Sequence, residues 1–313
     1  MLYDILVIGG GPAGLTAAVY ARRAGKTVLV LEKGAFGGQI TFSPAVENIP
    51  GFERVSGNEF ADRLTDQALA QGAELESAEV TGLVREDDGT FSAFSESDPD
   101  TGRSKTDRGR AVILASGAKH RTLGLPGEED FIGSGISFCA VCDGAFYRDR
   151  PVAVVGGGNS ALQEALLLSD LCEWVTVVQN LPVLTGEKPL ADALMERENV
   201  AVIFSSLLTA YEGDPETGLT GILVKHENGL TERVRADAVF LAVGLEPQNG
   251  PFSPLVPLDG RGYADADDSC ATPTPGLFVA GDCRKKKIRQ VTTAASDGAV
   301  AALAACDFLD GRG

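Results

Sequence analysis

Residues 3–34 read YDILVIGGGPAGLTAAVYARRAGKTVLVLEKG, and this stretch decides the fold of the first part of the chain. The pattern predicts an apolar strand at residues 5–8, a glycine-rich turn, a helix over 14–24 and a second strand over 27–31. A strand that runs through a glycine-rich turn into a helix begins a Rossmann-type unit, in which the helix N-terminus faces a pyrophosphate. The segment therefore predicts an α/β unit that binds a dinucleotide.

Three glycines and one acid carry this prediction. Gly9 permits a tight turn, Gly11 lets the backbone approach a pyrophosphate, and Gly14 lets helix and strand pack closely. Glu32 ends the second strand, where a carboxylate can accept hydrogen bonds from two ribose hydroxyls and would repel a 2′-phosphate. We therefore expect a dinucleotide with a free ribose in this unit.

A second segment repeats the pattern. Residues 151–180 read PVAVVGGGNSALQEALLLSDLCEWVTVVQN, again a strand, a glycine-rich turn, a helix and a strand. Two nucleotide-type units are therefore expected in one chain, with crossings near residues 117–125 and 244–249, which contain glycine or proline. Residues 74–110 alternate in polarity and predict a small antiparallel sheet.

Composition limits the partners. The chain has 313 residues, enough for two domains, and a net charge of −17 from 27 basic and 44 acidic residues. This charge disfavours binding to a phosphate backbone, so no nucleic-acid partner is expected. No apolar run approaches the roughly 18 residues of a membrane span, and the N-terminus enters a strand without a basic region or cleavage site. We expect a cytoplasmic protein without a membrane partner.

One basic loop departs from the acidic balance. The run Arg284-Lys285-Lys286-Lys287 is followed by Arg289. The loop is either a solvated surface segment or a docking patch for an acidic partner, and the sequence leaves both interpretations open.

The six cysteines fall into two groups. Four are scattered and are expected to be small buried residues. These are Cys172, Cys270, Cys283 and Cys306. The other two, in Cys139-Ala-Val-Cys142, have the spacing of a redox dithiol, in which two thiols form a disulfide through a small loop. No metal site is expected, because the chain has no second CxxC pair and its two histidines, His120 and His226, stand alone.

Six motifs follow one another along essentially the whole chain: GGGPAGLTAAVYARRAG, EKGAFGGQI, VENIPGF, CAVCDGAFY, VVGGGNSALQEA and GLFVAGDCRKKKIRQVTTAASDGAVAA. Together they resemble the low-molecular-weight thioredoxin reductases. The resemblance implies an α/β fold with two Rossmann-like, three-layer ββα domains, the second inserted into the first. It implies an FAD-binding domain at residues 1–116 and 247–313, an inserted NAD(P)H-like domain at 117–246 that carries the CxxC pair, and a homodimer.

The resemblance also implies which residues bind FAD. They are Gly9, Gly11, Pro12, Ala13, Gly14, Glu32, Lys33, Gly37, Gly38, Gln39, Asn48, Gly117, Gly281, Asp282, Arg289, Gln290 and Val291. Those that would line the flavin are Gly37, Gly38, Gln39 and Asn48. Asp282 would bind the ribityl and phosphate region, and Arg289-Gln290-Val291 would lie along the isoalloxazine ring.

The same resemblance assigns roles at the cysteine pair. Cys142 would be the thiol next to the flavin, and Cys139 would attack the disulfide of thioredoxin. Asp143 matches the acid of the family, which would protonate a leaving thiolate or the flavin. The alternative is that Asp143 is only a turn residue before Gly144.

The second glycine-rich turn departs from the NADPH-dependent pattern. The family usually has a His-Arg-Arg run and a further Arg after the second strand, where this chain has Gln179, Asn180, Leu181 and then Thr185. It also usually has Asp where Asn159 stands. Each lost charge-assisted hydrogen bond costs about 1.5–3 kcal/mol, so losing two or three weakens binding on the order of a thousandfold. NADPH should therefore bind poorly. NADH gains no acid in exchange, although Gln179 could hydrogen-bond a ribose weakly.

A pyridine-nucleotide-independent branch of this family takes electrons from reduced ferredoxin, and the chain resembles it in lacking these cations. Plant-type ferredoxins lie near roughly −400 mV and thioredoxin disulfides near roughly −270 mV, so the transfer of two electrons is about 6 kcal/mol downhill. A flavin links the two because it is stable with one electron or two. Ferredoxins are typically acidic, which gives the basic loop a role, although NADPH-dependent relatives also carry basic residues there.

The sequence therefore predicts an FAD-dependent disulfide oxidoreductase that reduces thioredoxin through Cys139 and Cys142 with electrons from ferredoxin. Three alternatives stay open: an NADPH- or NADH-dependent reductase with an atypical loop, an oxygen-dependent dithiol oxidase, and a flavin-binding sensor without turnover. Substitution of Cys139 by serine separates the sensor from the enzymes. It should abolish disulfide reduction in an enzyme, and it should leave the binding activity of a sensor intact.

Overall fold

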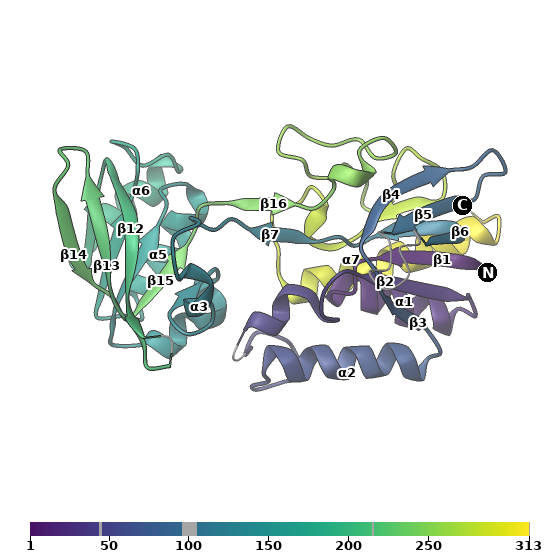
Figure 1. Ribbon diagram of the computed structural model, residues 1–313, viewed down its shortest axis with the longest axis horizontal. Coiled ribbons are helices and arrows are strands. Elements are labelled where there is room, and N and C mark those ends of the chain that lie inside the picture. The colour runs from purple at the N-terminus through teal and green to yellow at the C-terminus, as the bar shows by residue number, and fades with distance from the viewer. Residues whose placement is uncertain (44–45, 96–104, 215, 313) are drawn as a thin grey trace. The chain divides into compact units, whose positions relative to one another are not determined.

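The computed structural model describes residues 1–43, 46–95, 105–214 and 216–312. The chain divides into two compact units (Figure 1). The first comprises Met1–Thr41, Ile49–Lys119 and Glu246–Gly313, and the second comprises Phe42–Asn48 and His120–Leu245. Each unit is built on a sheet with parallel strands and packed helices, and the second is inserted into the first, so the predicted fold class is confirmed. Sequence patterns did not predict that Phe42–Asn48 groups with the second unit.

Parallel strands organise the first unit. β1 (Leu2–Ile8) lies between β2 (Val28–Glu32) and β6 (Thr106–Leu114), and both neighbours are parallel to it. β3 (Glu74–Ser77) extends the sheet beside β2, also in parallel. Because these strands run the same way, the turns that follow their carboxyl ends meet at one edge of the sheet, where α/β units bind ligands.

β6 changes partners along its length. Its first half pairs antiparallel with β5 (Phe91–Ser95), which pairs with β4 (Val80–Arg85), and its second half pairs parallel with β17 (Leu277–Val279). Over the described residues the sheet thus has seven strands. The antiparallel sheet expected within residues 74–110 is present as β4, β5 and the start of β6, whereas β3 is parallel; its residues 96–104 lie outside the described part of the chain.

Both faces of the parallel part of this sheet are covered, which explains why β2, β17 and the second half of β6 are almost entirely apolar. The helices of the unit are α1 (Pro12–Arg23), α2 (Gly57–Ala70) and α7 (Val291–Leu309). Alternate residues of a strand point to opposite faces. Ile5 and Val7 of β1 therefore pack in one core with all three helices, and Leu6 and Ile8 pack in another with residues of β4 and β5.

The second unit repeats the parallel core. Over its described residues a five-stranded parallel sheet has the order β11-β10-β9-β15-β8. The strands are β8 (Ile136–Ser137), β9 (Pro151–Val155), β10 (Trp174–Val178), β11 (Val200–Ile203) and β15 (Ala238–Leu241). One face shares a core with a three-stranded antiparallel sheet, and the other packs against α5 (Asn159–Ser169). The antiparallel sheet consists of β12 (Ser206–Asp214), β13 (Gly218–His226) and β14 (Thr231–Arg235).

Short elements complete both units. The remaining helices are α3 (Glu128–Phe131), α4 (Ala140–Asp143) and α6 (Lys188–Met195), with 3-10 helices η1 (Gly38–Phe42), η2 (Gly144–Tyr147), η3 (Gly250–Phe252) and η4 (Gly281–Cys283). β7 (Ala118–His120) and β16 (Leu245–Pro247) pair with each other where the chain crosses between the units. Within the described ranges, no helix is long and apolar enough to span a bilayer.

Candidate functional site

The first glycine-rich turn has the geometry that the sequence predicts. Gly9 has a φ of +108°, and a Cβ there would lie 2.1 Å from the carbonyl oxygen of Ala115. A Cβ on Gly14 would lie 1.8 Å from the carbonyl oxygen of Gly9, so neither position admits a side chain. At Gly11, by contrast, the nearest atom to an added Cβ is 3.9 Å away. The turn is therefore closed on the side of the sheet and open at Gly11, where a pyrophosphate would approach the N-terminus of α1.

Glu32 is tied to this turn at the carboxyl end of β2. The N–H of Gly10 donates to its Oε2 (2.6 Å) and the N–H of Gly34 donates to its Oε1 (2.8 Å). A carboxylate offers about four acceptor sites, so two stay available for ribose hydroxyls. The backbone thus fixes the carboxylate beside the open turn in the place that a dinucleotide ribose requires.

A second loop closes over the turn. Gly37 donates its N–H to the carbonyl of Gly10 (2.8 Å), and its φ of +107° together with a Cβ position 2.2 Å from Ala61 requires glycine. Gly38 also has a positive φ, and its Cβ position would lie 3.2 Å from the Cα of Gly11. This structure therefore brings the predicted residues of the first two motifs into one cluster.

Gln39, the next residue of this loop, reaches the segment around Gly117 and Ala118. Its Nε2 donates to the carbonyl of Ala118 (2.9 Å), next to Gly117, which has a φ of +70°. A Cβ at Gly117 would meet no atom within 4 Å, so space is open on that side of the backbone. This hydrogen bond therefore joins Gln39 to the residue that follows Gly117.

The C-terminal motif reaches the same turn from the other end of the chain. Gly281 has a φ of +81°, and a Cβ there would lie 2.8 Å from that of Ala13, in the first turn of α1. Asp282 follows it, and its buried Oδ1 has no hydrogen-bond partner among the described residues, while Lys286 Nζ lies 3.6 Å from it as an ion pair. Burial raises the pKa of this carboxyl above its ordinary value, while the charges of Lys286 and Arg289 oppose the shift. A buried acceptor without a donor fits a ligand hydroxyl, such as one on the ribityl chain of FAD.

Arg289 folds back on this segment instead of pointing into solvent. Its Nε donates to the carbonyl of Asp282 (3.2 Å), and its guanidinium lies 4.1 Å from the ring centre of Tyr263. Gln290 caps α7, with its N–H donating to Oγ1 of Thr293 (3.1 Å), and Val291 is the first residue of that helix. The predicted trio therefore begins a helix beside Asp282.

Asp297 is a residue that the sequence analysis missed. It lies on α7 and is 8% exposed. Its Oδ2 accepts hydrogen bonds from the N–H of Gly281 (3.1 Å) and from Lys286 Nζ (3.0 Å). The other carboxylate oxygen of Asp297, Oδ1, accepts a hydrogen bond from Arg284 Nη2 (3.3 Å). The only signal in the sequence is that Asp297 is one of two acids, with Asp307, in a helix of mostly small and apolar residues. Asp297 thus anchors the turn that presents Asp282.

This pairing corrects one interpretation of the basic loop at residues 284–289. Arg284 and Lys286 are largely buried against Asp297. Arg289 donates to the carbonyl of Asp282 and lies over the ring of Tyr263. Lys285 and Lys287 are exposed, and Lys285 lies 3.4 Å from Asp265. The loop is therefore not wholly solvated, since most of its charge holds its own unit together, and docking of an acidic partner stays a prediction.

Three further predicted residues differ in where the structure places them. Pro12 is the first residue of α1, a position at which its missing N–H costs nothing. Lys33 follows Glu32 but is exposed and pairs with Glu79 at 3.7 Å. Asn48 groups with the second unit, so its predicted place beside the flavin stays a prediction.

The cysteine pair lies in the second unit at the start of α4. Cys139 is the N-cap residue of this short helix, and a disulfide joins it to Cys142, with a Cα–Cα distance of 5.3 Å. Both cysteines are partly exposed, and Val141 between them is 60% exposed. The CxxC spacing therefore forms the disulfide that a redox dithiol needs, on a surface that a partner can reach.

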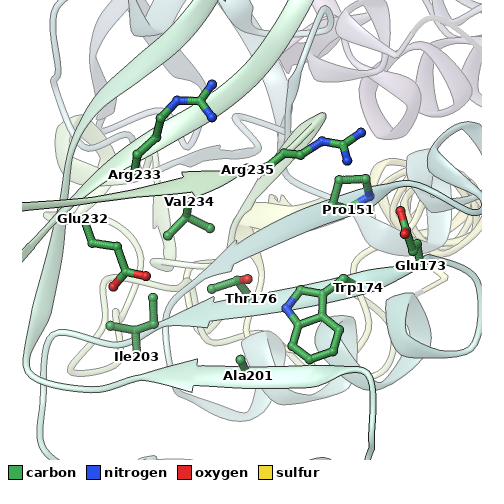
Figure 2. A pocket seen from close by; sticks show the side chains of 10 residues that line it. All are labelled: Pro151, Glu173, Trp174, Thr176, Ala201, Ile203, Glu232, Arg233, Val234 and Arg235. Carbon is green, nitrogen blue, oxygen red and sulfur yellow. The ribbon is translucent and has the colours of Figure 1, made fainter.

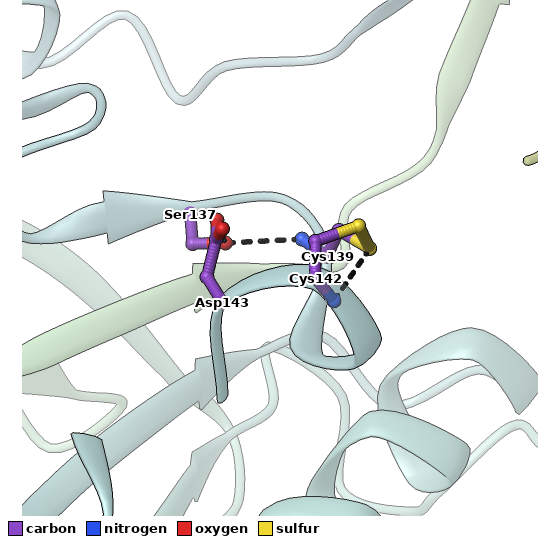
Figure 3. The surroundings of a disulfide bond; sticks show 4 residues. All are labelled: Ser137, Cys139, Cys142 and Asp143. Carbon is purple, nitrogen blue, oxygen red and sulfur yellow. Dashed lines mark hydrogen bonds between the residues drawn. A yellow bond between two sulfur atoms is a disulfide. The ribbon is translucent and has the colours of Figure 1, made fainter. Parts of the chain in front are cut away.

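Ser137 links the carboxyl of Asp143 to the backbone of Cys139, the first cysteine of this disulfide (Figure 3). Ser137 Oγ donates to Asp143 Oδ2 (2.6 Å) and accepts the N–H of Cys139 (3.1 Å). Burial raises the pKa of Asp143, and the hydrogen bond from Ser137 opposes this shift. A carboxyl with a raised pKa next to a disulfide can act as a proton donor, which a plain turn residue would not need.

The second glycine-rich turn, in the same unit, keeps its backbone but not its charges. Gly156 has a φ of +131°, and a Cβ there would lie 2.6 Å from the carbonyl oxygen of Ala242. Gln179 takes the place that Glu32 has in the first unit, but it is only 3% exposed and its Nε2 donates to the carbonyl of Val183 (2.9 Å). Its Nε2 is therefore bonded within its own loop, and its side chain is buried.

The rest of this loop also bonds to itself and to the turn. The N–H groups of Thr185 and Gly186 donate to the carbonyl of Gly157 (2.8 and 3.0 Å). Asn159 accepts the N–H of Glu187 (2.6 Å) and donates to its side chain (3.2 Å). Residues 179–187 contain no Lys or Arg, so the loop offers a phosphate no charged partner of its own.

A cavity of about 500 Å³ opens elsewhere in the second unit (Figure 2). Its lining includes Trp174, the one tryptophan of the chain, together with Thr176 and Arg235. Pro151 and Trp174 are the first residues of β9 and β10, whereas the glycine-rich turn and Gln179 follow the carboxyl ends of these strands. The cavity therefore extends along β10 and β11 from the amino end of β10 to Ile203, whose carbonyl accepts the N–H of Gln179 (2.9 Å).

The four other cysteines are buried, as the sequence predicts. Burial raises the pKa of Cys172 and Cys270 to about 11, and it also raises the pKa of Cys283 and Cys306, so none is a reactive thiolate at neutral pH. In the part of the chain that the structure describes, no group of three or more His, Cys, Asp or Glu side chains is placed to hold a metal ion.

Comparison with known proteins agrees with this geometry. A profile of the pyridine nucleotide-disulphide oxidoreductases matches residues 3–298. A thioredoxin reductase of Treponema pallidum is 40% identical over 318 residues, which cover 98% of this chain and 97% of the relative. A thioredoxin reductase of Listeria monocytogenes is 38% identical over 309 residues, covering 99% and 94%.

A solved structure supports the same assignment. The crystal structure of thioredoxin reductase from Streptococcus pyogenes MGAS5005 is 36% identical, covers 99% of both chains and superposes with a TM-score of 0.90. The first unit supplies the cradle at Gly11, the fixed carboxylate of Glu32 and a buried oxygen of Asp282 that makes no hydrogen bond among the described residues, all of which fit a flavin dinucleotide. The chain therefore belongs to the pyridine nucleotide-disulphide oxidoreductases, and among them to the low-molecular-weight thioredoxin reductase family, which uses FAD.

Proposed function

We propose that this protein reduces the disulfide of thioredoxin, or of a thioredoxin-like protein, through Cys139 and Cys142, with FAD bound in the first unit. The observation that carries the proposal is the Cys139–Cys142 disulfide at the start of α4, with the buried carboxyl of Asp143 beside it. The named relatives are thioredoxin reductases, which supports the choice of substrate. The functional division of the chain at residues 1–116 with 247–313 and 117–246 is part of this proposal.

Each residue has a separate task in this scheme. Cys139, as thiolate, attacks a sulfur of the partner's disulfide and forms a mixed disulfide with it. Cys142 then attacks the sulfur of Cys139, which releases the reduced partner and restores the Cys139–Cys142 bond. Asp143 moves a proton between the thiols and the leaving sulfurs. When bound, FAD supplies the two electrons that reduce the disulfide again.

Trapping of the mixed disulfide tests these roles. The Cys142→Ser variant should form a stable disulfide through Cys139 with a thioredoxin that lacks its own resolving cysteine, because the second attack cannot occur. Mass spectrometry of the covalent complex identifies the two cysteines. The Cys139→Ser variant should form no such complex. Cys306→Ala serves as a control, because it removes a buried cysteine and retains both Cys139 and Cys142. A complex that forms equally well through Cys142 in Cys139→Ser would reverse the assigned roles.

We further propose that the electron donor is a one-electron carrier such as reduced ferredoxin, and not NADPH. The support comes from the second glycine-rich turn, where the loop of residues 179–187 lacks cations and Gln179 is closed onto Val183. The next cations along the chain, Lys188 and Arg197, pair with Asp192 and Asp170. The basic loop at 284–289 does not add to this support, because most of it is paired internally.

Nucleotide binding tests the negative half of this proposal without turnover. The affinity for NADP⁺ is measured by isothermal titration of the FAD-loaded protein. It should be lower, on the order of a thousandfold, than the affinity of a site that has two or three phosphate-binding cations. A micromolar dissociation constant would show that the 2′-phosphate finds other partners and would contradict the proposal.

A nicotinamide donor is the second candidate, and one observation favours it. The turn at Gly156 and the N-terminus of α5 keep the backbone geometry that holds a pyrophosphate in Rossmann-type units. NADH, which lacks the 2′-phosphate, would suffer least from the missing cations.

The family pattern also leads us to propose a homodimer. Sedimentation equilibrium of the FAD-loaded protein should then give twice the mass of the chain. A monomer at micromolar concentration would contradict this part of the proposal.

A further inference from the structure

A hydrogen-bonded chain links the backbone of the first redox cysteine to the carboxyl of Asp143 (Figure 3). The N–H of Cys139 donates to Ser137 Oγ (3.1 Å), and Ser137 Oγ donates to Asp143 Oδ2 (2.6 Å). Ser137 ends the short strand β8, is 6% exposed, and is thus fixed by the sheet and not by the redox loop. The other carboxyl oxygen, Oδ1 of Asp143, is buried and has no partner among the described residues.

The direction of each hydrogen bond follows from what the groups can do. A backbone N–H can only donate, so Ser137 Oγ must accept from Cys139. The serine hydroxyl has one hydrogen, and Asp143 Oδ2 is its one acceptor within the described residues. If Oδ2 carried a proton and donated it to Ser137, the hydroxyl hydrogen would be left buried and unpaired, which is unfavourable. Oδ2 therefore stays an acceptor, and a proton on Asp143 must be on Oδ1.

We propose that Ser137 is a positioning residue that makes Oδ1 of Asp143 the oxygen that carries and passes on the proton during disulfide exchange at Cys139 and Cys142. The proposal rests on the disulfide chemistry proposed above and adds a residue to it. Ser137 touches neither sulfur through its hydroxyl, and it acts by orienting Asp143 and by holding the backbone of Cys139.

The exchange balances with this assignment. The reduced pair loses two electrons and two protons, the Cys139–Cys142 bond forms, and the partner's disulfide bond breaks. The two sulfurs of the partner gain the electrons and the protons. Oδ1 of Asp143 takes a proton from a thiol of the pair and gives it to a leaving sulfur, so that the carboxyl returns to its starting state.

Ser137 should also set how readily this proton leaves. Its hydroxyl stabilises the ionised carboxylate, which opposes the effect of burial. Loss of that hydrogen bond in Ser137→Ala should raise the pH at which Asp143 ionises by about one unit, a tenfold change in its proton affinity. Ser137→Thr retains the hydroxyl and should restore the original value.

The test measures the dithiol without donor or thioredoxin. The FAD-loaded protein is reduced with dithiothreitol, freed of it under nitrogen, and alkylated with iodoacetamide across a pH series, with each cysteine quantified by mass spectrometry. The main rise in alkylation with pH should come from ionisation of the thiols. A second inflection in the same pH profile should occur where Asp143 ionises. We expect this inflection at higher pH in Ser137→Ala, at its original pH in Ser137→Thr, and absent in Asp143→Asn.

Controls separate positioning from folding. Ser134→Ala removes a nearby hydroxyl that donates to the carbonyl of Asp130 (3.2 Å) and should leave the profile unchanged. Flavin absorbance and circular dichroism should match the wild type in every variant. The proposal is overturned if Ser137→Ala keeps the wild-type inflection, if Ser137→Thr fails to restore it, or if Asp143→Asn leaves it in place. Failure to reduce thioredoxin would overturn the proposed function and leave this profile unaffected.

Discussion

Glu32 decides which dinucleotide the first unit can hold, because its carboxylate is fixed by the N–H groups of Gly10 and Gly34 at the open side of the turn. Glu32→Gln keeps the shape but removes the charge and one acceptor. FAD should therefore bind more weakly by about 1.5–3 kcal/mol, roughly ten- to a hundredfold. Titration of the flavin-free protein with FAD, followed by flavin fluorescence, measures this. Glu79→Gln, which removes an exposed acid that pairs with Lys33, is the matched control and should bind FAD normally.

Single residues differ in how far the sequence reveals them. Gly9 and Gly14 could be predicted because their roles depend on local turn geometry, and the clashes that a Cβ would make confirm it. Asp297 could not, because its partners Gly281 and Arg284 come from a different element and their approach depends on how α7 packs. Ser137 belongs to the same class, since its role exists only once β8 lies beside α4.

At the scale of one element, the loop after β10 lacks the cations that would bind a 2′-phosphate, while the backbone of the glycine-rich turn beside it persists. Asn180 and Leu181 are exposed, and Thr185 lies within reach of the glycine-rich turn, since its Oγ1 hydrogen-bonds the carbonyl of Gly157. The triple variant Asn180→Arg, Leu181→Arg and Thr185→Arg adds three cations and leaves the Gln179 bond in place. It should bind NADP⁺ more tightly, on the order of a thousandfold, in isothermal titration.

A matched triple variant isolates charge from size. Glutamine at the same three positions, 180, 181 and 185, adds similar bulk and no charge, and it should bind NADP⁺ as weakly as the wild type. Equal binding by the arginine and glutamine variants would show that the missing cations are not what limits nucleotide affinity.

Helix α5 contains a buried carboxyl that links its stability to pH. Burial raises the pKa of Glu164 from 4.5 to about 8, and its Oε2 has no hydrogen-bond partner in the described part of the chain. Between these pH values the folded state holds a proton that the unfolded state releases, so stability falls as pH rises and stays low above pH 8. Glu164→Gln removes this penalty.

Thermal melting measures the effect. The gain in melting temperature of Glu164→Gln over the wild type should be larger at about pH 8.5 than at about pH 5.5. Glu173→Gln, at an exposed position, should show no such difference. A gain that is the same at both pH values would mean that Glu164 is ionised in the folded protein.

Elements were predictable where the pattern is local and long. The helix expected from residue 14 begins at Pro12, because proline suits the first position of a helix. The four-residue helix α4 has too few residues to show a helical period, and it exists because Cys139 caps it and the disulfide closes it. The internal pairing of the basic loop could not be predicted, because charge alone does not reveal that Arg284 and Lys286 have a buried acid to pair with.

At the scale of the whole molecule, the chain contains two Rossmann-like units whose nucleotide sites have diverged. The first retains an acid at the end of its second strand, and the second has Gln179 in the corresponding place. The presence of two α/β units could be predicted from the repeated strand, turn and helix. The grouping of Phe42–Asn48 with the second unit could not, because it depends on contacts between distant segments.

The order of electron flow is the central claim, and anaerobic absorbance of the bound flavin tests it most directly. NADPH, then NADH, then reduced ferredoxin are added in turn while the oxidised flavin band is followed. We predict that only ferredoxin bleaches the band and that added thioredoxin restores it. Bleaching by ferredoxin without recovery would contradict thioredoxin reduction and favour an oxidase or a sensor. Rapid bleaching by micromolar NADPH or NADH would contradict the proposed donor and show that the loop of residues 179–187 still serves a nicotinamide nucleotide.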